Sequence, residues 1–180
     1  MTPAQLTTLK TAINANPTWA AFPLTGDGFY DLARALSQEA VPTFWVWSTN
    51  ADVGVVRAAV TWANLTPADA PDGTQQWANR SLQCQGKQFN LQNLLLGADT
   101  INFALPNILS GFQDALTALP TKADGTNQQA GWTALQLKIS RTANILEKLL
   151  ATGTGTQASP GTMTFQGTIG YVEVQSIMGW

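Results

Sequence analysis

Proline and glycine breaks cut this chain into short segments, and they constrain its fold more than any other feature. The breaks lie at Asn16-Pro17, Gly26 to Gly28, Pro42, residues 66–74, Pro106 and residues 120–129. Proline lacks an amide hydrogen and the residue before it avoids the α region, so helices tend to end there. Between the breaks, apolar residues recur three or four positions apart, which is the spacing of one helix face. The sequence therefore predicts a mainly α protein, a helical bundle of five or six helices.

The starts of the first helices can be read from capping residues. Thr2 offers a hydroxyl cap, and the proline that follows it fits the first helical position. Asp27 is predicted to cap a second helix that runs to Leu36, and Thr49 or Asn50 a third. The remaining helices are expected over residues 75–85, 89–104, 107–119 and 131–151.

The last of these predicted helices, residues 131–151, combines an apolar face with a basic one. The apolar face consists of Trp132, Leu135, Ile139, Ala143, Leu146 and Leu150. Lys138, Arg141 and Lys148 are predicted to share another face. Three positive charges are too few to indicate nucleic-acid binding. We interpret this basic helix face as a solvated surface or a contact between subunits.

The chain after Ala151 predicts a second domain, residues 152–180, next to a helical domain of residues 1–151. Residues 152–162 are rich in Thr, Gly, Ser and Pro, which is typical of a flexible neck. Beyond them, Val172 and Val174 alternate with other residues in a pattern of short β segments. We expect an extended C-terminal arm that grips a neighbouring subunit, because disordered tails, the alternative, seldom carry so many large apolar residues. The expected contacts are Met163, Phe165, Ile169, Tyr171, Val172, Val174 and Trp180.

An aromatic run follows Pro42. Phe44, Trp45 and Trp47 place three large rings within four residues, and these cannot all face one side of a helix. The run is either a core corner between helices or a surface on which another subunit packs. Both interpretations remain open from the sequence.

The side chains exclude several kinds of chemistry. The chain has no histidine and a single cysteine, Cys84. This excludes Ser-His and Cys-His catalysis and most zinc or non-haem iron sites. Asp69 and Asp72 lack the calcium-loop pattern, and residues 153–156 lack the strand and lysine of a phosphate loop. We therefore predict no catalytic residue, no metal ion and no cofactor, and we expect that the protein is not an enzyme.

Charge is scarce in this chain. Charged residues make up 11% of it, against roughly 25% in typical soluble domains. Surface charge normally keeps copies of a protein apart, so a surface short of charge suits a protein that partners cover. The net charge of −2 gives no general attraction to nucleic acid. The sequence has neither a stretch of ~20 apolar residues nor a secretion signal, so we expect synthesis in a cytosol and no membrane partner.

Three stretches resemble small proteins encoded among the head and tail assembly genes of tailed bacteriophages. They are TPAQLTTLKTAI at residues 2–13, FWVWST at residues 44–49 and LLATGTGTQASPGTMTFQG at residues 149–167. The part from Thr66 to Gly131 lies outside the resemblance. The third stretch is the most specific, since its Gly-Thr repeat leads into Ser-Pro and Met-Thr-Phe.

The resemblance implies a structural virion protein of the head-to-tail connector, or adaptor, type. Such a protein would form a ring with copies of itself and bind the portal protein and tail or neck proteins, with only non-specific proximity to DNA. It would be made in the cytoplasm of the bacterial host and would lie in the neck of the virion. The alternative is a soluble helical assembly chaperone or binding module that is not retained in the virion.

Overall fold

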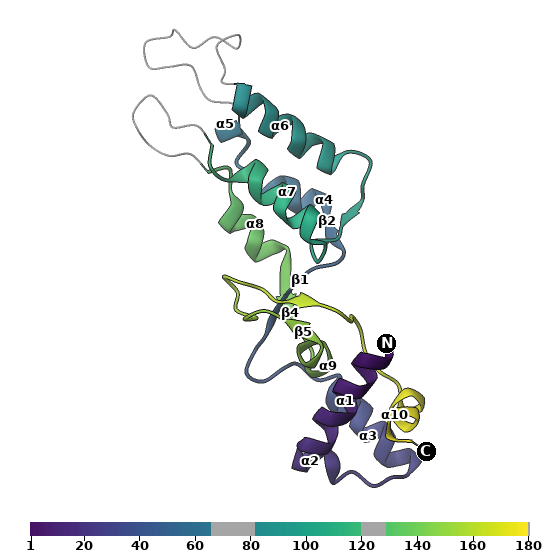
Figure 1. Ribbon diagram of the computed structural model, residues 1–180. Coiled ribbons are helices and arrows are strands. Elements are labelled where there is room, and N and C mark those ends of the chain that lie inside the picture. The colour runs from purple at the N-terminus through teal and green to yellow at the C-terminus, as the bar shows by residue number, and fades with distance from the viewer. Residues whose placement is uncertain (66–81, 120–128, 180) are drawn as a thin grey trace. The chain divides into compact units, whose positions relative to one another are not determined.

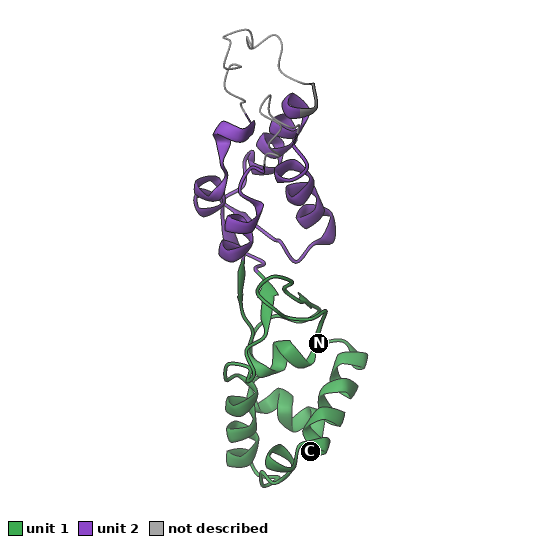
Figure 2. Cartoon of the chain, turned by 90° about the vertical axis from the view of Figure 1, so that its left-hand side faces the viewer, with its two compact units in different colours: residues 1–47, 140–180 green, residues 48–139 purple. Residues whose placement is uncertain are grey.

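The computed structural model describes residues 1–65, 82–119 and 129–179 (Figure 1). Within these ranges the chain forms ten helices and three two-stranded antiparallel sheets, which confirms the mainly α class. The helices belong to two compact units rather than to one bundle (Figure 2). Unit 1 consists of residues 1–47 and 140–180, and unit 2 of residues 48–139. The predicted boundary after Ala151 therefore falls inside unit 1.

Unit 1 is built from both ends of the chain. Its helices are α1 (Pro3–Ala15), α2 (Pro17–Ala20), α3 (Gly26–Leu36), α9 (Ile145–Leu149) and α10 (Tyr171–Met178). Its strands are β1 (Trp45–Trp47), β4 (Ser140–Thr142), β5 (Ala151–Thr152) and β6 (Thr162–Met163). α1 starts as predicted, because the Thr2 hydroxyl accepts from the Gln5 amide and the Gln5 side chain accepts from the Thr2 amide. Asn16 ends α1, and its side chain caps α2.

The core of unit 1 contains the C-terminal segment. α10 lies against α3 and α1 (Figure 1). Ile169, Val174 and Ile177 are buried there among Leu9, Ile13, Phe29, Leu32, Leu36 and Leu146. Residues 171–178 form a helix and not the predicted β segments. The buried residues Val174 and Ile177 lie three positions apart, which is the spacing of a helix face and not of a strand face. The expectation of an arm that stands apart from its own domain is wrong for this segment.

Trp45 and Trp47 of the aromatic run lie in strand β1, and Phe44 directly precedes it. β1 pairs with β4 in antiparallel register, with Trp45 opposite Thr142, and Val46 opposite Arg141. On its other edge the Trp45 amide donates to the Gly155 carbonyl at 2.7 Å, and the Gly161 amide donates to the Trp45 carbonyl at 2.8 Å. Because successive side chains of a strand point to opposite faces, Trp45 and Trp47 share one face of β1 and Val46 lies on the other.

The long helix predicted over residues 131–151 does not form. Three elements replace it, namely α8 (Trp132–Lys138) in unit 2 and then β4 and α9 in unit 1. Lys138 ends α8, Arg141 lies in β4 and Lys148 lies in α9. The predicted basic helix face is therefore wrong, because β1 pairs with residues 140–142 and takes them out of any helix.

Unit 2 packs α4 (Val53–Ala59), α5 (Trp62–Leu65), α6 (Leu82–Leu95), α7 (Pro106–Leu116) and α8 around an apolar core. Strands β2 (Ala51–Asp52) and β3 (Thr100–Ile101) pair beside α4. The Phe103 and Phe112 rings are both fully buried, with centroids 4.9 Å apart. Asp52 caps α4, in place of the predicted Thr49 or Asn50. The predicted loops at residues 66–74 and 120–129 lie outside the described residues except for Gln129, as do Asp69, Asp72 and residues 75–81 of the helix predicted over residues 75–85.

Helices α6 and α7 run antiparallel. The Lys87 ammonium on α6 contacts the Asp114 carboxylate on α7 at 3.1 Å and also donates to the Asp114 carbonyl. Nearer the other end, Gly111 of α7 faces the Leu94 side chain of α6. The Lys87 side chain is 8% exposed, so the one charged residue among 82–95 points inward.

Candidate contact surfaces and the Arg141–Glu147 network

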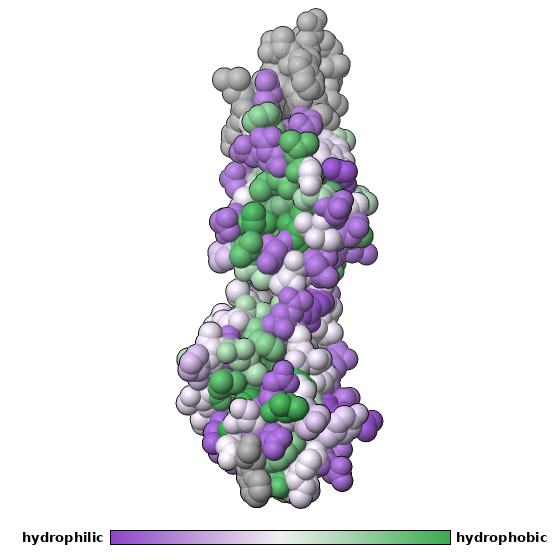
Figure 3. Space-filling model, turned by 90° about the vertical axis from the view of Figure 1, so that its right-hand side faces the viewer, coloured by the Kyte–Doolittle hydropathy of each residue, from purple (hydrophilic) through white to green (hydrophobic). Residues whose placement is uncertain are grey.

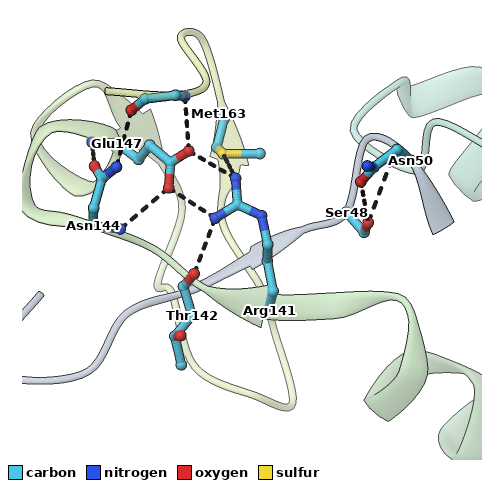
Figure 4. A network of polar contacts seen from close by, with 8 residues as sticks. Ser48, Asn50, Arg141, Thr142, Asn144, Glu147 and Met163 are labelled. Atoms are coloured by element: carbon cyan, nitrogen blue, oxygen red, sulfur yellow. Dashed lines mark hydrogen bonds and ion pairs between the residues drawn. The ribbon is translucent and has the colours of Figure 1, made fainter. Parts of the chain in front are cut away.

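A buried carboxylate organises the middle of unit 1 (Figure 4). The Arg141 guanidinium donates to Glu147 Oε2 at 2.8 Å through Nη1 and to Oε1 at 2.7 Å through Nη2. The Glu147 side chain is 3% exposed, and that of Arg141 is 35% exposed. Such a two-pronged pair is the strong form of an ion pair, because both hydrogen bonds are charge-assisted and their geometry is fixed.

Backbone amides complete the shell of Glu147. The Gly167 amide donates to Oε1 at 3.0 Å, and the Asn144 amide donates to Oε2 at 3.1 Å. Each carboxylate oxygen thus accepts two hydrogen bonds, which fills the roughly four acceptor positions of the group. No acceptor position is left for a substrate proton or a metal ion. The geometry makes Glu147 a structural anchor.

The network joins segments that are distant in the sequence. The Asn144 side chain accepts from the Glu147 amide at 2.8 Å and donates to the Gly167 carbonyl at 2.9 Å. Arg141 also donates to the Thr142 carbonyl at 3.0 Å and lies 3.4 Å from the Met163 sulfur. β4, the start of α9, β6 and the chain before α10 are therefore held by one set of contacts.

The network also sets the ionisation of the pair. Burial raises the pKa of Glu147, but the hydrogen bonds from Arg141, Gly167 and Asn144 outweigh it and leave the pKa below its usual range. The hydrogen bond with Glu147 raises the pKa of Arg141 further above its usual value. The pair stays charged in the folded protein, and Arg141 is not available as a free surface cation.

The Gly-Thr stretch wraps a phenylalanine ring. A Cβ atom at Gly155 would lie 2.0 Å from Phe44 Cε2, and one at Gly161 would lie 2.7 Å from Phe44 Cε1. Thr156 and Ser159 exchange backbone hydrogen bonds of 3.1 and 3.2 Å between these glycines. Gly155 and Gly161, within the stretch of residues 152–162 that composition predicted as a flexible neck, therefore pack directly against the Phe44 ring.

The predicted contact residues differ in how far they are exposed to solvent. Ile169, Val174 and Trp47 are buried in unit 1. Phe44, Trp45, Met163 and Phe165 are half-buried. Tyr171 and Val172 remain exposed, at 49% and 59%. Trp180 lies outside the described residues. Of the described contact residues of the arm, Tyr171 and Val172 are the ones that leave about half or more of their surface open to a partner.

Other exposed apolar side chains were not predicted. Phe89 is 63% and Leu96 78% exposed in unit 2, and Val41 is 88% and Tyr30 61% exposed in unit 1. Figure 3 shows apolar groups gathering on the face of unit 2 that it draws, bordered by hydrophilic ones. Phe89 on α6 and Leu96 just after its end lie about two helical turns apart and opposite the buried face of the helix, but the weak apolar pattern of α6 gave no signal for them in the sequence.

The cavity described in unit 1 has no room for a small molecule. A cavity of about 20 Å³ lies in unit 1, lined by Trp19, Phe22, Leu32 and Met178 among others. That volume holds about one water molecule. Among the described residues, no three His, Cys, Asp or Glu side chains gather as metal ligands. No helix of the described ranges combines the length and apolar character needed to cross a bilayer.

Comparison of the chain with protein-family models, curated proteins and solved structures found no match.

Proposed function

We propose that this chain is a structural subunit of a tailed-phage particle, in a ring that connects the portal to the tail. The observation that carries the proposal is a surface with little charge and several exposed large apolar side chains: Phe89, Leu96, Val41, Tyr30 and Val172 are each more than half exposed. Charged residues make up only 11% of the chain. Such surfaces favour burial against other protein.

The described interior of unit 1 is consistent with a mechanical role. The buried Glu147 carboxylate forms its hydrogen bonds with Arg141 and with the backbone amides of Asn144 and Gly167. The described cavity accepts about one water molecule, far less than the roughly 300–1,000 Å³ of small-molecule sites. In the proposed ring, one face of the subunit docks on the portal, another receives the tail, and DNA passes through the lumen.

The connector role rests on the resemblance of residues 2–13, 44–49 and 149–167 to phage assembly proteins. The alternative is an assembly chaperone, which would also need exposed apolar surface but would leave before the particle is complete. Exposed apolar side chains favour both roles equally, so retention in the particle decides between them.

Quantitative mass spectrometry of purified particles tests this proposal. A connector is expected at a fixed copy number in every particle, in the range of the portal protein. Its absence from mature particles, together with its presence in assembly intermediates, would favour the chaperone. Absence from both would contradict a role in assembly.

A further inference from the structure

The outer side of α6 carries a stripe without charge. We define the α6 stripe as Gly86, Phe89 and Asn93 of α6 together with Leu96, the first residue after the helix; the four recur at three- and four-residue intervals. All four are exposed. The opposite side of the helix, formed by Cys84, Lys87, Leu91 and Leu95, is buried in unit 2. The stripe is therefore the centre of the solvent-facing side of α6.

We infer that the α6 stripe is a contact surface for a second copy of this chain, with two α6 helices packed antiparallel. Positions 89 and 96 lie symmetrically about Asn93 and its neighbour Gln92. An antiparallel pair centred there sets Phe89 of each copy against Leu96 of the other. A two-fold contact of this kind uses the same patch on both subunits.

The chemistry of the stripe favours a copy of itself over a charged partner. A patch with charge of one sign repels its own copy, whereas an amide both donates and accepts hydrogen bonds. Asn90, Gln92 and Asn93 are exposed around the two apolar side chains. The one cation of the helix, Lys87, is turned inward onto Asp114. The patch is thus complementary to itself in charge and in hydrogen bonding.

Gly86 gives independent support. A Cβ atom at Gly86 would meet nothing within 4 Å, so no contact with the described residues requires glycine at this place. Glycine inside a helix is less stable than alanine. In the register that sets Phe89 against Leu96, Gly86 lies across from position 99 of the second copy, so a close approach by the chain just after that copy's α6 explains why the position lacks a side chain. This inference concerns the free protein and does not depend on the proposed function.

Sedimentation or light scattering of the full chain over a concentration series tests the inference. The wild-type protein is expected to dimerise as its concentration rises. Leu96→Glu and Phe89→Lys should each weaken the dimer at least tenfold and leave the circular dichroism spectrum unchanged. Tyr30→Glu, at a comparably exposed site in unit 1, is the matched control and should leave dimerisation unchanged.

The register has its own test. Phe89→Lys and Leu96→Glu combined in one chain place opposite charges across the proposed contact, so the double variant should dimerise more tightly than either single variant. Gly86→Ala should raise the melting temperature of the monomer and weaken the dimer. A wild-type protein that stays monomeric, a dimer indifferent to both single variants, or a double variant no better than the singles would each overturn the inference.

Discussion

The Arg141 guanidinium and the Glu147 carboxylate meet through two hydrogen bonds of 2.8 and 2.7 Å, and each Glu147 oxygen also accepts a backbone amide. Because one of those amides belongs to Gly167, the pair ties the chain before α10 to the start of α9. The position of the C-terminal helix thus depends on a carboxylate that is 3% exposed.

Arg141→Ala is expected to destabilise unit 1 by about 2–3 kcal/mol. The substitution leaves a buried carboxylate without its cation, and the partial exposure of Arg141 keeps the loss below that of a fully buried pair. Urea unfolding followed by circular dichroism measures the change. Arg34→Ala, at an exposed site on α3, serves as the control and should stay within about 0.5 kcal/mol of wild type. Equal effects of the two substitutions would show that the Arg141–Glu147 network does not add to the stability of unit 1.

Stability should fall in acid because of Glu147. Its pKa is lowered in the folded state, so the unfolded chain binds the proton more tightly. The stabilisation is complete well above the reference value of 4.5 and is lost as the pH falls through the lower folded pKa. Unfolding measured from pH 7 to pH 3 should show this loss in the wild type. Glu147→Gln should be less stable at pH 7 and should show a smaller decline in acid. Parallel curves for the two proteins would contradict the assignment.

Gly155→Ala should destabilise unit 1 more than Gly153→Ala. Both glycines have positive φ values, +65° and +97°, so both substitutions strain the backbone. Only the new methyl group at position 155 would collide with Phe44, whereas the nearest atom at position 153 is 3.4 Å away. The difference should be about 1–3 kcal/mol, the usual cost of overpacking. Thermal unfolding of both variants measures it, and similar losses would mean that Phe44 moves aside freely.

The sequence predicted the start of α1 and the break after it because those signals are local, whereas Thr25, and not the predicted Asp27, caps α3. Thr2 caps α1, and Asn16 before Pro17 separates α1 from α2. These outcomes depend on residues within a few positions of one another, and no distant partner competes with them.

The failure at residues 131–151 has a long-range cause. Leu135, Ile139, Ala143, Leu146 and Leu150 are all buried, as their spacing predicted. They nevertheless belong to two cores, with Leu135 and Ile139 in unit 2 and the others in unit 1. The helix is interrupted because residues 140–142 pair with β1, about 95 positions away in sequence. No local sequence pattern reveals this pairing. One local signal was missed: Asn144 and Glu147 form the capping box that starts α9.

The candidate site was less predictable than the fold. Exposure of Phe89 and Leu96 depends on which side of α6 meets α7, and the hydrophobic pattern of that helix is weak. Glu147 appears in the sequence as one of 11 acidic residues. Its role becomes visible only when Gly167 and Arg141 are placed around it.

Removal of the C-terminal segment should unfold unit 1. A chain that ends at Ala151 lacks Ile169, Val174 and Ile177, which are all buried. Each lost core side chain costs about 2–5 kcal/mol, and three together approach the roughly 5–15 kcal/mol that stabilises a whole domain. Hydrogen exchange should show loss of protection in α1 and α3. The point variant Ile177→Ala should lose about 2–4 kcal/mol, whereas Val172→Ala, at an exposed site on the same helix, should lose little. A truncated chain with protected α1 and α3 would contradict the fold described for unit 1.

The central functional claim is that copies of this chain form a ring between portal and tail. A reconstruction of the particle neck without imposed symmetry tests it most directly. The account predicts a closed ring of repeated density between portal and tail, in which each repeat accepts unit 1 and unit 2 as separately fitted bodies. A neck in which other proteins explain all of the density, with no place for either unit, would contradict it.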